Sequence, residues 1–351
     1  DIERQKALKE ALYTFLLNKR EEVALQLAIE EANVRLVEEP MSTGSPVSPR
    51  SSIIMFAAFI IGLLIPAGII FLLEQFNTKV KRRLDVEKAT DVPIVGEIPK
   101  WDNYVDTQTI ADISHDSTIS EAFRVLRYQI DFLRHNAKVF VITSSTPHQG
   151  KSFTSKNLAT VLSLTGKKVL VIDADIRKRS ISRTLSNPKR NGLTSYLNED
   201  MGTKSLASYV QADKIHTGVD FLPCGVIPPN PTELLMSARL EELIEEAKQT
   251  YDYIVIDTTP VISVADASIV DRVADLTLFV IRMDVEEITF LPQLDRLSHE
   301  KKLRNMAIIL NDVDLRKSYG YGYGYGYSYG YGYGQDFDRM NKKKKKFFSK
   351  K

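Results

Sequence analysis

The chain has 351 residues, of which 43% are hydrophobic and 26% charged, and its formal net charge is +2. This length is enough for roughly two or three structural units, and the composition is that of a globular protein. Cys224 is the only cysteine, which excludes a disulfide framework and a cysteine-based zinc site. The histidines are scattered without metal-ligand spacing, and we expect no nucleic-acid partner. Because the chain begins at Asp1 rather than Met, we interpret it as the C-terminal part of a longer protein.

Residues 1–39 have the composition of a long helix, with neither Gly nor Pro before Pro40. Apolar residues recur there at roughly helical spacing, which predicts an amphipathic helix that packs on another helix. They are Leu8, Leu12, Phe15, Leu16, Val23, Leu27 and Val34. Residues 40–52 are rich in Pro, Ser and Gly, and we interpret them as a linker.

An uncharged apolar run occupies residues 53–73, and about 20 such residues span a bilayer. The absence of a polar face argues against a buried core helix. Basic residues crowd the C-terminal side of this run, namely Lys79, Lys81, Arg82 and Arg83. The positive-inside rule therefore predicts a transmembrane helix with its C-terminal side in the cytoplasm and residues 1–39 outside. Residues 74–118 then form a connector, with a short strand over 92–101.

Strand-like and helix-like segments alternate over residues 119–316, which predicts an α/β domain with a mainly parallel sheet. The expected strands cover residues 139–143, 169–172, 219–222, 253–259, 276–282 and 306–310. An amphipathic helix is expected over 120–135, and Thr232 is a plausible N-cap for a helix that continues to about Gln249. Ligands of such sheets bind at the carboxyl ends of the strands.

A phosphate-binding loop is predicted at Ser145–Ser152, between an apolar strand and a helix. The usual pattern is G-x-x-x-x-G-K-[ST], and here Ser145 stands at the first Gly. Backbone N–H groups of the loop would face the phosphates, Lys151 would reach the β- and γ-phosphates, and the Ser152 hydroxyl would hold Mg²⁺. A Gly-Lys-Ser triplet alone is a weak signal, because ordinary turns contain it by chance.

Acidic residues that end apolar strands strengthen this interpretation. Asp173 and Asp175 follow one strand, and Asp257 ends another. A carboxylate at the end of a rigid strand is suited to hold a metal ion at the edge of the sheet. Strand, loop, helix and acid in this order predict a site for a nucleoside triphosphate.

The C-terminal tail alternates Tyr and Gly over residues 318–334, and glycine at nearly every other place cannot hold a helix. Its tyrosines are Tyr319, Tyr321, Tyr323, Tyr325, Tyr327, Tyr329, Tyr331 and Tyr333. We expect a flexible segment, whose tyrosines are either phosphate acceptors or parts of a self-associating tract. The lysines that follow, within residues 342–351, form either a solvated end or a contact with anionic lipid.

A charged stripe on the helix over 120–135 consists of Glu121, Arg124 and Arg127. These residues form either an ion pair within the helix or salt bridges to a neighbouring subunit.

Together these features resemble the bacterial tyrosine kinases of the membrane polysaccharide co-polymerase family. The resemblance rests on residues 145–152 as Walker A, 171–177 as Walker A′ and 254–260 as Walker B. It also rests on the Glu121-x-x-Arg124-x-x-Arg127 oligomerisation motif, the tyrosine cluster, and the Pro-rich segment before the membrane run. The resemblance implies that the ATP-binding loop is formed by Ser145, Thr146, Pro147, His148, Gln149, Gly150, Lys151, Ser152 and Phe153.

The resemblance implies an inner-membrane kinase with a cytoplasmic catalytic domain that uses ATP and Mg²⁺. Lys151 and Ser152 would bind phosphate and metal, Asp173 would be the base for the tyrosine hydroxyl, and Asp175 and Asp257 would support the metal. Autophosphorylation of the tail would occur between neighbours in a homo-oligomeric ring. Its cycling, reset by a cognate phosphatase, would control the polysaccharide polymerase and export machinery.

Two departures from the family pattern leave alternatives open. His148 and Gln149 replace the usual Gly and acidic residue, and we expect a side chain at position 148 to crowd the backbone near the phosphates. They support one alternative, a non-catalytic nucleotide-binding scaffold that sets polysaccharide chain length. The other is a deviant P-loop positioning ATPase, a group that has Lys where this chain has Thr146.

Overall fold

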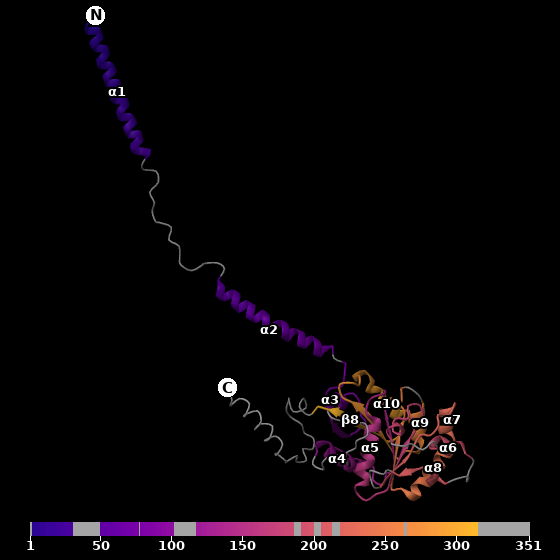
Figure 1. Ribbon diagram of the computed structural model, residues 1–351. Helices are drawn as coiled ribbons and strands as arrows, with labels where there is room; N and C mark the ends of the chain where they lie inside the picture. The colour runs from indigo at the N-terminus through magenta and orange to yellow at the C-terminus, as the bar shows by residue number, and fades with distance from the viewer. Residues whose placement is uncertain are drawn as a thin grey trace. The chain divides into compact units, whose positions relative to one another are not determined.

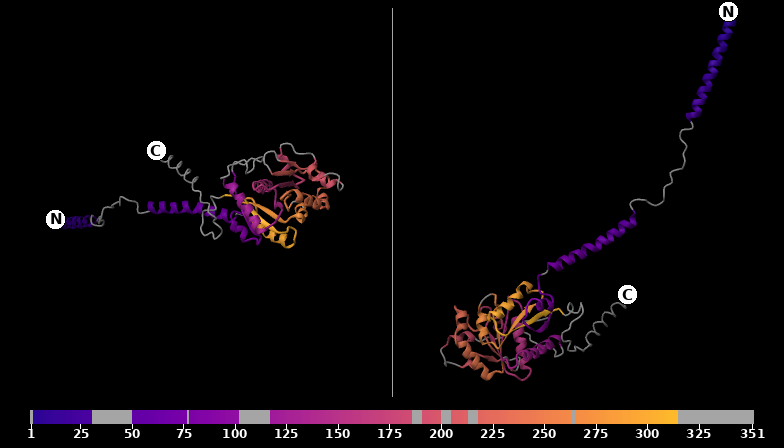
Figure 2. Two further views of the ribbon diagram at one scale, coloured as in Figure 1. Left: turned by 90° about the horizontal axis from the view of Figure 1, so that it is seen from below. Right: turned by 180° about the vertical axis from the view of Figure 1, so that it is seen from behind.

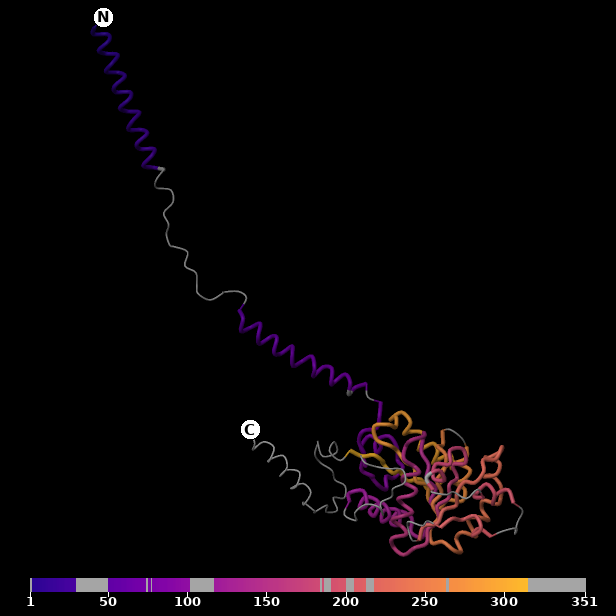
Figure 3. The backbone as a smooth tube through the Cα atoms, viewed as in Figure 1, coloured from indigo at the N-terminus to yellow at the C-terminus, as the bar shows by residue number. Residues whose placement is uncertain are grey.

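The computed structural model of the protein describes residues 2–30, 50–76, 78–101, 117–185, 191–199, 205–212, 218–262 and 265–314. The chain divides into two units, Asp1–Asn77 and Thr78–Lys351, and each is described by itself. The first unit contains helix α1 (Ile2–Glu30) and helix α2 (Ser51–Gln75), which Figure 3 traces as two separate coils.

Helix α1 confirms the predicted helix as far as Glu30, and residues 31–49 lie outside the described part of the chain. The predicted amphipathic face is wrong. Leu17 follows Leu8 by nine residues, which is about two and a half helical turns, so the two side chains point in opposite directions. The predicted face included Leu8 but not Leu17 or Leu25, which are also apolar and exposed, so apolar side chains lie on more than one side of α1.

Helix α2 contains the whole predicted membrane run and extends it by two residues at each end. Within it, Ser51–Leu73 is long and apolar enough to cross a membrane, judged by length and composition. Its large apolar side chains, such as Phe56, Phe59 and Leu64, are exposed. A helix with apolar residues on all sides is suited to a lipid environment.

The described residues of the second unit form one sheet of eight strands, in the order β1-β8-β7-β2-β6-β3-β5-β4. The strands are β1 (Ile94–Pro99), β2 (Val139–Ser144), β3 (Val169–Asp173), β4 (Gln211–Ala212), β5 (Val219–Leu222), β6 (Tyr253–Asp257), β7 (Leu276–Arg282) and β8 (Met306–Val313). Every neighbouring pair is parallel except β4 and β5. The predicted mainly parallel α/β fold is thereby confirmed (Figure 1).

Helices cover both faces of this sheet (Figure 2). They are α3 (Arg83–Glu87), α4 (Thr118–Leu133), α5 (Lys151–Ser163), α6 (Leu193–Asn198), α7 (Pro231–Met236), α8 (Arg239–Thr250), α9 (Asp266–Val270) and α10 (Pro292–His299), with short 3-10 helices η2 (Ser182–Thr184), η3 (Leu206–Ser208), η4 (Asp271–Val273) and η5 (Ile288–Phe290). Successive side chains of β3 point to opposite faces of the sheet and pack in different cores. Val169 and Val171 join the core under α4 and α5, whereas Leu170 and Ile172 join the core under α6, α7 and α8.

The segment expected to be a connector, residues 74–118, contributes to the domain itself. Its predicted strand is β1, which pairs with β8 at one edge of the sheet, and the compact unit begins at Thr78. Val80 and Val86 are fully buried in a third core cluster with residues of β7, β8 and α10. The chain is therefore part of the folded domain within a few residues of the end of α2.

The predicted helix from Thr232 to about Gln249 is two helices, α7 and α8, interrupted at Ser237–Ala238. Its predicted N-cap is wrong. Asn230 is the cap residue and Pro231 occupies the first turn, where its fixed φ favours helix initiation. Thr232 instead donates a hydrogen bond from Oγ1 to Asp266 Oδ1 at 2.8 Å, which joins α7 to α9.

Candidate active site

Three neighbouring strands, β2, β6 and β3, carry the predicted site at their carboxyl ends. Strand β2 leads into the loop Ser145–Gly150, β6 ends at Asp257 and β3 ends at Asp173. Because the strands are parallel, these ends meet at one edge of the sheet, which is where ligands of open α/β sheets bind.

The phosphate-binding loop turns sharply into α5. Gly150 caps the helix with φ 96°, in the left-handed region where a side chain is strained, and a Cβ there would overlap the side-chain amide of Asn311. His148 also has a positive φ, 67°, and its side chain is exposed. The first N–H groups of an α-helix lack partners within the helix, so the start of α5 presents donors suited to a phosphate.

Asp257 is fully buried and lies within reach of two hydroxyls of α5. Ser152 donates from Oγ to Asp257 Oδ2 at 2.6 Å, and Ser155 donates to Oδ1 at 3.1 Å. Burial raises the pKa of Asp257 to about 6, while Lys151 and the hydroxyl donors oppose that shift. Ser152 and Asp257 are thus brought together as the predicted metal site requires.

Lys151, the first residue of α5, is 7% exposed. Burial lowers the pKa of its ammonium, and the charges of Asp257 and Asp175 raise it. The loop lysine and two of the predicted metal-supporting carboxylates therefore share one electrostatic environment.

Asp173 lies directly opposite Asp257 in the register of β3 and β6. Its Oδ2 accepts hydrogen bonds from the Ser182 backbone N–H at 2.7 Å and the Ser182 hydroxyl at 2.6 Å, while Oδ1 is buried without a partner among the described residues. Burial, reinforced by the negative charge of Asp257, raises the pKa of Asp173 to about 7.

Asp175 is 2% exposed and is the second residue of the loop after β3. Its Oδ1 accepts the backbone N–H of Lys178 at 3.0 Å, and its Oδ2 accepts the hydroxyl of Ser180 at 3.4 Å. These bonds fix the loop that holds the Asp175 carboxylate near those of Asp173 and Asp257.

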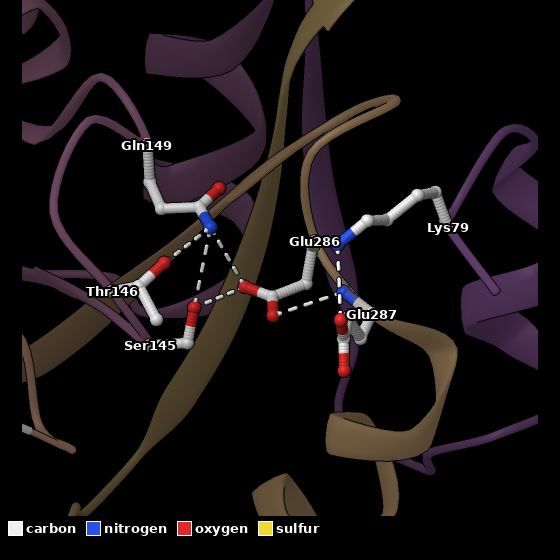
Figure 4. A network of polar contacts seen from close by, with 6 residues as sticks. All are labelled: Lys79, Ser145, Thr146, Gln149, Glu286 and Glu287. Atoms are coloured by element: carbon white, nitrogen blue, oxygen red, sulfur yellow. Dashed lines mark hydrogen bonds and ion pairs between the residues drawn. The ribbon is translucent and has the colours of Figure 1, made fainter.

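Gln149, the second departure from the family pattern, is fully buried. Its Nε2 donates to Thr146 Oγ1 at 2.9 Å and to Glu286 Oε2 at 3.0 Å, and its Oε1 accepts the backbone N–H of Arg282 at 2.7 Å. Figure 4 shows the amide pointing toward Ser145 and Glu286. The departure from the family pattern at this position is therefore accommodated by a local network.

Phe153 was expected among the ATP-binding residues, and its ring belongs to an aromatic cluster. It packs edge-on against Trp101 and Phe123, with ring centroids 6.1 Å and 5.8 Å away. Pro147 lies in the loop itself, partly buried. The side chain of Phe153 thus stabilises the start of α5 against α4.

Sequence reasoning missed three residues that hold the site: Ser182, Glu286 and Asn311. Asn311 donates from Nδ2 to the carbonyl of Gln149 at 2.9 Å. None belongs to a recognisable motif. Glu286 and Asn311 lie far along the chain from Gln149, which they contact, whereas Ser182 lies nine residues after Asp173. The pairing of distant strands brings Glu286 and Asn311 to the phosphate-binding loop, and the turn after β3 brings Ser182 back to Asp173.

The charged stripe of α4 makes contacts within the subunit. Arg124 pairs with Glu121 at 2.9 Å, and Arg127 donates from Nη1 to the carbonyl of Val161 in α5 at 2.8 Å. The predicted phosphate-accepting tyrosines, residues 319–333, lie outside the described part of the chain.

The residues at the strand ends fit a Mg²⁺–nucleotide complex. Mg²⁺ characteristically takes one or two protein carboxylates, with phosphate and water completing its shell. Here the buried Asp257 carboxylate already contacts the Ser152 hydroxyl. At the neighbouring strand end, Oδ1 of Asp173 has no hydrogen-bond partner within the part of the chain that the structure describes. The helix terminus and Lys151 supply the groups that phosphate oxygens bind.

A parallel sheet with a Gly-Lys-Ser helix start and two strand-terminal aspartates defines a P-loop nucleotide-binding protein. The family model of the AAA domain matches residues 137–308, and that of the "G-rich domain on putative tyrosine kinase" matches residues 1–75. The tyrosine-protein kinase Wzc of Salmonella typhimurium is 32% identical over 323 residues, which cover 86% of this chain and 44% of that protein. The tyrosine-protein kinase Ptk of Acinetobacter johnsonii is 30% identical over 329 residues, 90% of this chain and 44% of that protein.

The solved kinase domain of the Escherichia coli tyrosine kinase ETK is matched over its full length. It is 31% identical, with a TM-score of 0.60, and the match covers 70% of this chain and 100% of that domain. The chain belongs to the Wzc family of bacterial tyrosine kinases. It spans less than half the length of the curated relatives described above.

Proposed function

We propose that the protein is an ATP-dependent protein-tyrosine autokinase that phosphorylates the C-terminal tyrosine cluster of neighbouring subunits. The observation that carries this proposal is the meeting of Lys151 and Ser152 with Asp173 and Asp257 at one edge of the sheet, in a chain that also carries eight closely spaced tyrosines over residues 319–333.

Phosphoryl transfer needs mainly positioning and neutralisation of charge. The N–H groups at the start of α5 would bind the phosphates, and Lys151 would place its ammonium on the β- and γ-phosphates. Ser152, Asp175 and Asp257 would hold Mg²⁺, which supplies charge neutralisation at the transferred group when it is bound.

Asp173 would accept the proton of the incoming tyrosine hydroxyl. A base works best when its pKa lies near the working pH, and burial raises that of Asp173 to about 7. Ser182 occupies Oδ2, so Oδ1 is the oxygen left to receive the proton. The hydrogen bonds from Ser182 would keep the carboxylate in this orientation.

The polypeptide context supports a membrane-bound oligomer. Helix α2 would anchor the protein in the inner membrane, with α1 on the extracytoplasmic side and the kinase domain in the cytoplasm.

Glu121, Arg124 and Arg127 would contribute to contacts between subunits in a ring. Each phosphate adds roughly −1.5 to −2 charge, so a phosphorylated tail would repel its neighbours and loosen the ring. A cognate phosphatase would reset this state, and the cycle would regulate exopolysaccharide or capsule synthesis and export.

The proposal is tested by incubating the full chain with Mg²⁺ and ATP and probing with an antibody to phosphotyrosine. Lys151→Met should abolish the signal, and Lys167→Met, an exposed lysine paired with Asp252, is the matched control. Replacing all eight tail tyrosines by Phe should also remove the signal. A non-catalytic scaffold would give none with any variant, and a positioning ATPase would release phosphate without labelling the tail.

Transfer between subunits has its own test. The Lys151→Met chain, which keeps its tail, is mixed with an active chain whose tail tyrosines are Phe. Phosphotyrosine on the Lys151→Met chain is the expected result, and its absence would contradict transfer between neighbours.

A further inference from the structure

Glu286 is a buried carboxylate beside the phosphate-binding loop, and no role in the proposed chemistry uses it. It lies in the turn after β7 and is 4% exposed. A buried carboxylate is unfavourable unless hydrogen-bond donors satisfy it. Its donors therefore indicate what this residue holds in place.

Two of those donors belong to the loop. Glu286 Oε2 accepts the hydroxyl of Ser145 and, at 3.0 Å, the side-chain amide of Gln149. Its Oε1 accepts the backbone N–H of Glu287 at 3.2 Å. Figure 4 shows that the Ser145 and Gln149 side chains converge on the same carboxylate oxygen.

Gln149 transmits this constraint to the catalytic residues. It immediately precedes Gly150 and Lys151, its Oε1 accepts the N–H of Arg282, and its carbonyl accepts the Asn311 amide. Glu286 thus completes a set of contacts that fix the loop from the β7 and β8 side.

The turn that carries Glu286 is itself anchored by the first residues of the domain. The N–H of Val80 donates to the Glu286 carbonyl at 2.9 Å, the Asp284 N–H donates to the Val80 carbonyl at 2.8 Å, and the Ile288 N–H donates to the Thr78 carbonyl at 2.9 Å. The backbone behind the carboxylate is therefore held on both sides.

We propose that Glu286 is a positioning residue for ATP binding, which sets the conformation of the phosphate-binding loop through Ser145 and Gln149. The inference rests on the proposed nucleotide site. It also accounts for Ser145, where the usual motif has Gly. The serine side chain is fully buried because its hydroxyl is directed to Glu286.

The test uses the full chain and measures binding of a non-hydrolysable ATP analogue with Mg²⁺ by calorimetry. Glu286→Ala should weaken binding about tenfold, because two buried donors of the loop lose their acceptor. Glu286→Gln keeps one oxygen for Ser145 and Gln149, so it should bind within about twofold of the parent. Glu287→Ala, an exposed neighbour in the same turn, is the matched control and should bind normally.

Thermal unfolding without nucleotide separates positioning from general stability. Gln149→Ala leaves Glu286 in place and carries the same prediction if Glu286→Ala fails to fold. The double variant should lose less affinity than the two single losses added together, because Glu286 and Gln149 share one hydrogen bond. Normal analogue binding by Glu286→Ala, or by Gln149→Ala, would overturn the proposal, as would a lower unfolding temperature with unchanged affinity.

Because the readout is nucleotide binding, it does not depend on tyrosine phosphorylation. A parent chain that binds the analogue but never labels its tail would contradict the proposed kinase activity and leave the role of Glu286 intact. If the parent chain labels its tail and the Glu286→Ala variant binds the analogue normally, the proposed kinase activity stands and the positioning role of Glu286 is contradicted.

Discussion

Asp173 and Asp257 stand side by side at the ends of adjacent parallel strands, both almost completely buried. Burial raises the pKa of Asp173 to about 7 and that of Asp257 to about 6. Two carboxylates this close resist simultaneous ionisation. The folded protein therefore contains a site whose charge is best balanced by a bound cation.

Stability of the metal-free protein should fall as the pH rises from 5 to 8. A raised carboxyl pKa means that the folded state holds protons that the unfolded state releases above its ordinary value of 3.8. The stabilising contribution is complete below that value and is lost as the pH passes through about 7. Urea unfolding at several pH values measures it, and Asp173→Asn should flatten the slope. An unchanged slope in this variant would contradict the assigned shift.

Tail phosphorylation should increase with pH through about 7, because Asp173 must be ionised to accept a proton. Asp173→Asn should lower the initial rate by about 10²- to 10⁴-fold. Asp131→Asn, an exposed aspartate on α4, is the control and should keep the parental rate and profile. A variant at Asp173 with the parental pH profile would assign the base elsewhere.

The two serines that contact Asp257 should behave differently. Ser152→Ala removes the hydroxyl proposed to hold Mg²⁺, so half-maximal activity should require on the order of tenfold more Mg²⁺. Ser155→Ala also removes a donor to Asp257, yet Ser155 lies one turn further along α5. A Mg²⁺ titration of both variants tests this, and equal shifts would count against a separate metal role for Ser152.

Ser182→Ala should reduce the rate of tail phosphorylation about tenfold while leaving nucleotide affinity near the parental value. The hydroxyl orients Asp173 and also accepts the Cys224 N–H at 2.9 Å. Ser237→Ala is the control, because the Ser237 hydroxyl donates to the Leu234 carbonyl rather than to a carboxylate of the site. Single-turnover rates and analogue binding, measured in parallel, distinguish orientation of the base from loss of binding.

Variants at Arg127 and Arg124 should differ in their effect on the stability of the fold. Arg127→Ala removes the bond to the Val161 carbonyl and should lower the free energy of unfolding by about 1–2 kcal/mol. Arg124→Ala loses a partly exposed ion pair with Glu121, a kind of contact worth little, and should change the free energy of unfolding less than Arg127→Ala does. Urea unfolding of both variants measures the difference. A parental unfolding free energy for Arg127→Ala would show that this contact does not stabilise the fold.

The sequence allowed the core of the fold to be predicted because the strands are continuous apolar runs. Asp173 and Asp257 were identifiable because each ends such a run, and parallel pairing then brings them together. The interruption between α7 and α8 escaped prediction because residues 231–250 contain no internal breaker, and the N-cap was misplaced by the presence of Thr232.

The support of the loop could not be predicted for a different reason. Gln149 and Glu286 are separated by 137 residues, and no spacing rule relates them. Position 149 therefore looked like a defect in a motif. Its contribution depends on where the turn after β7 lies relative to β2, which only tertiary structure defines.

Strand β8 lies two strands from β2 and parallel to it, so β8 ends, at Val313, on the same edge of the sheet as the phosphate-binding loop. Tyr319 follows Val313 by six residues, a tether of up to about 20 Å, while adjacent strands are only about 4.8 Å apart. By length alone, Tyr319 can therefore reach the proposed site of its own subunit. Tether length alone does not reserve the tyrosines for a neighbour, so any preference for intermolecular transfer must come from how subunits are arranged.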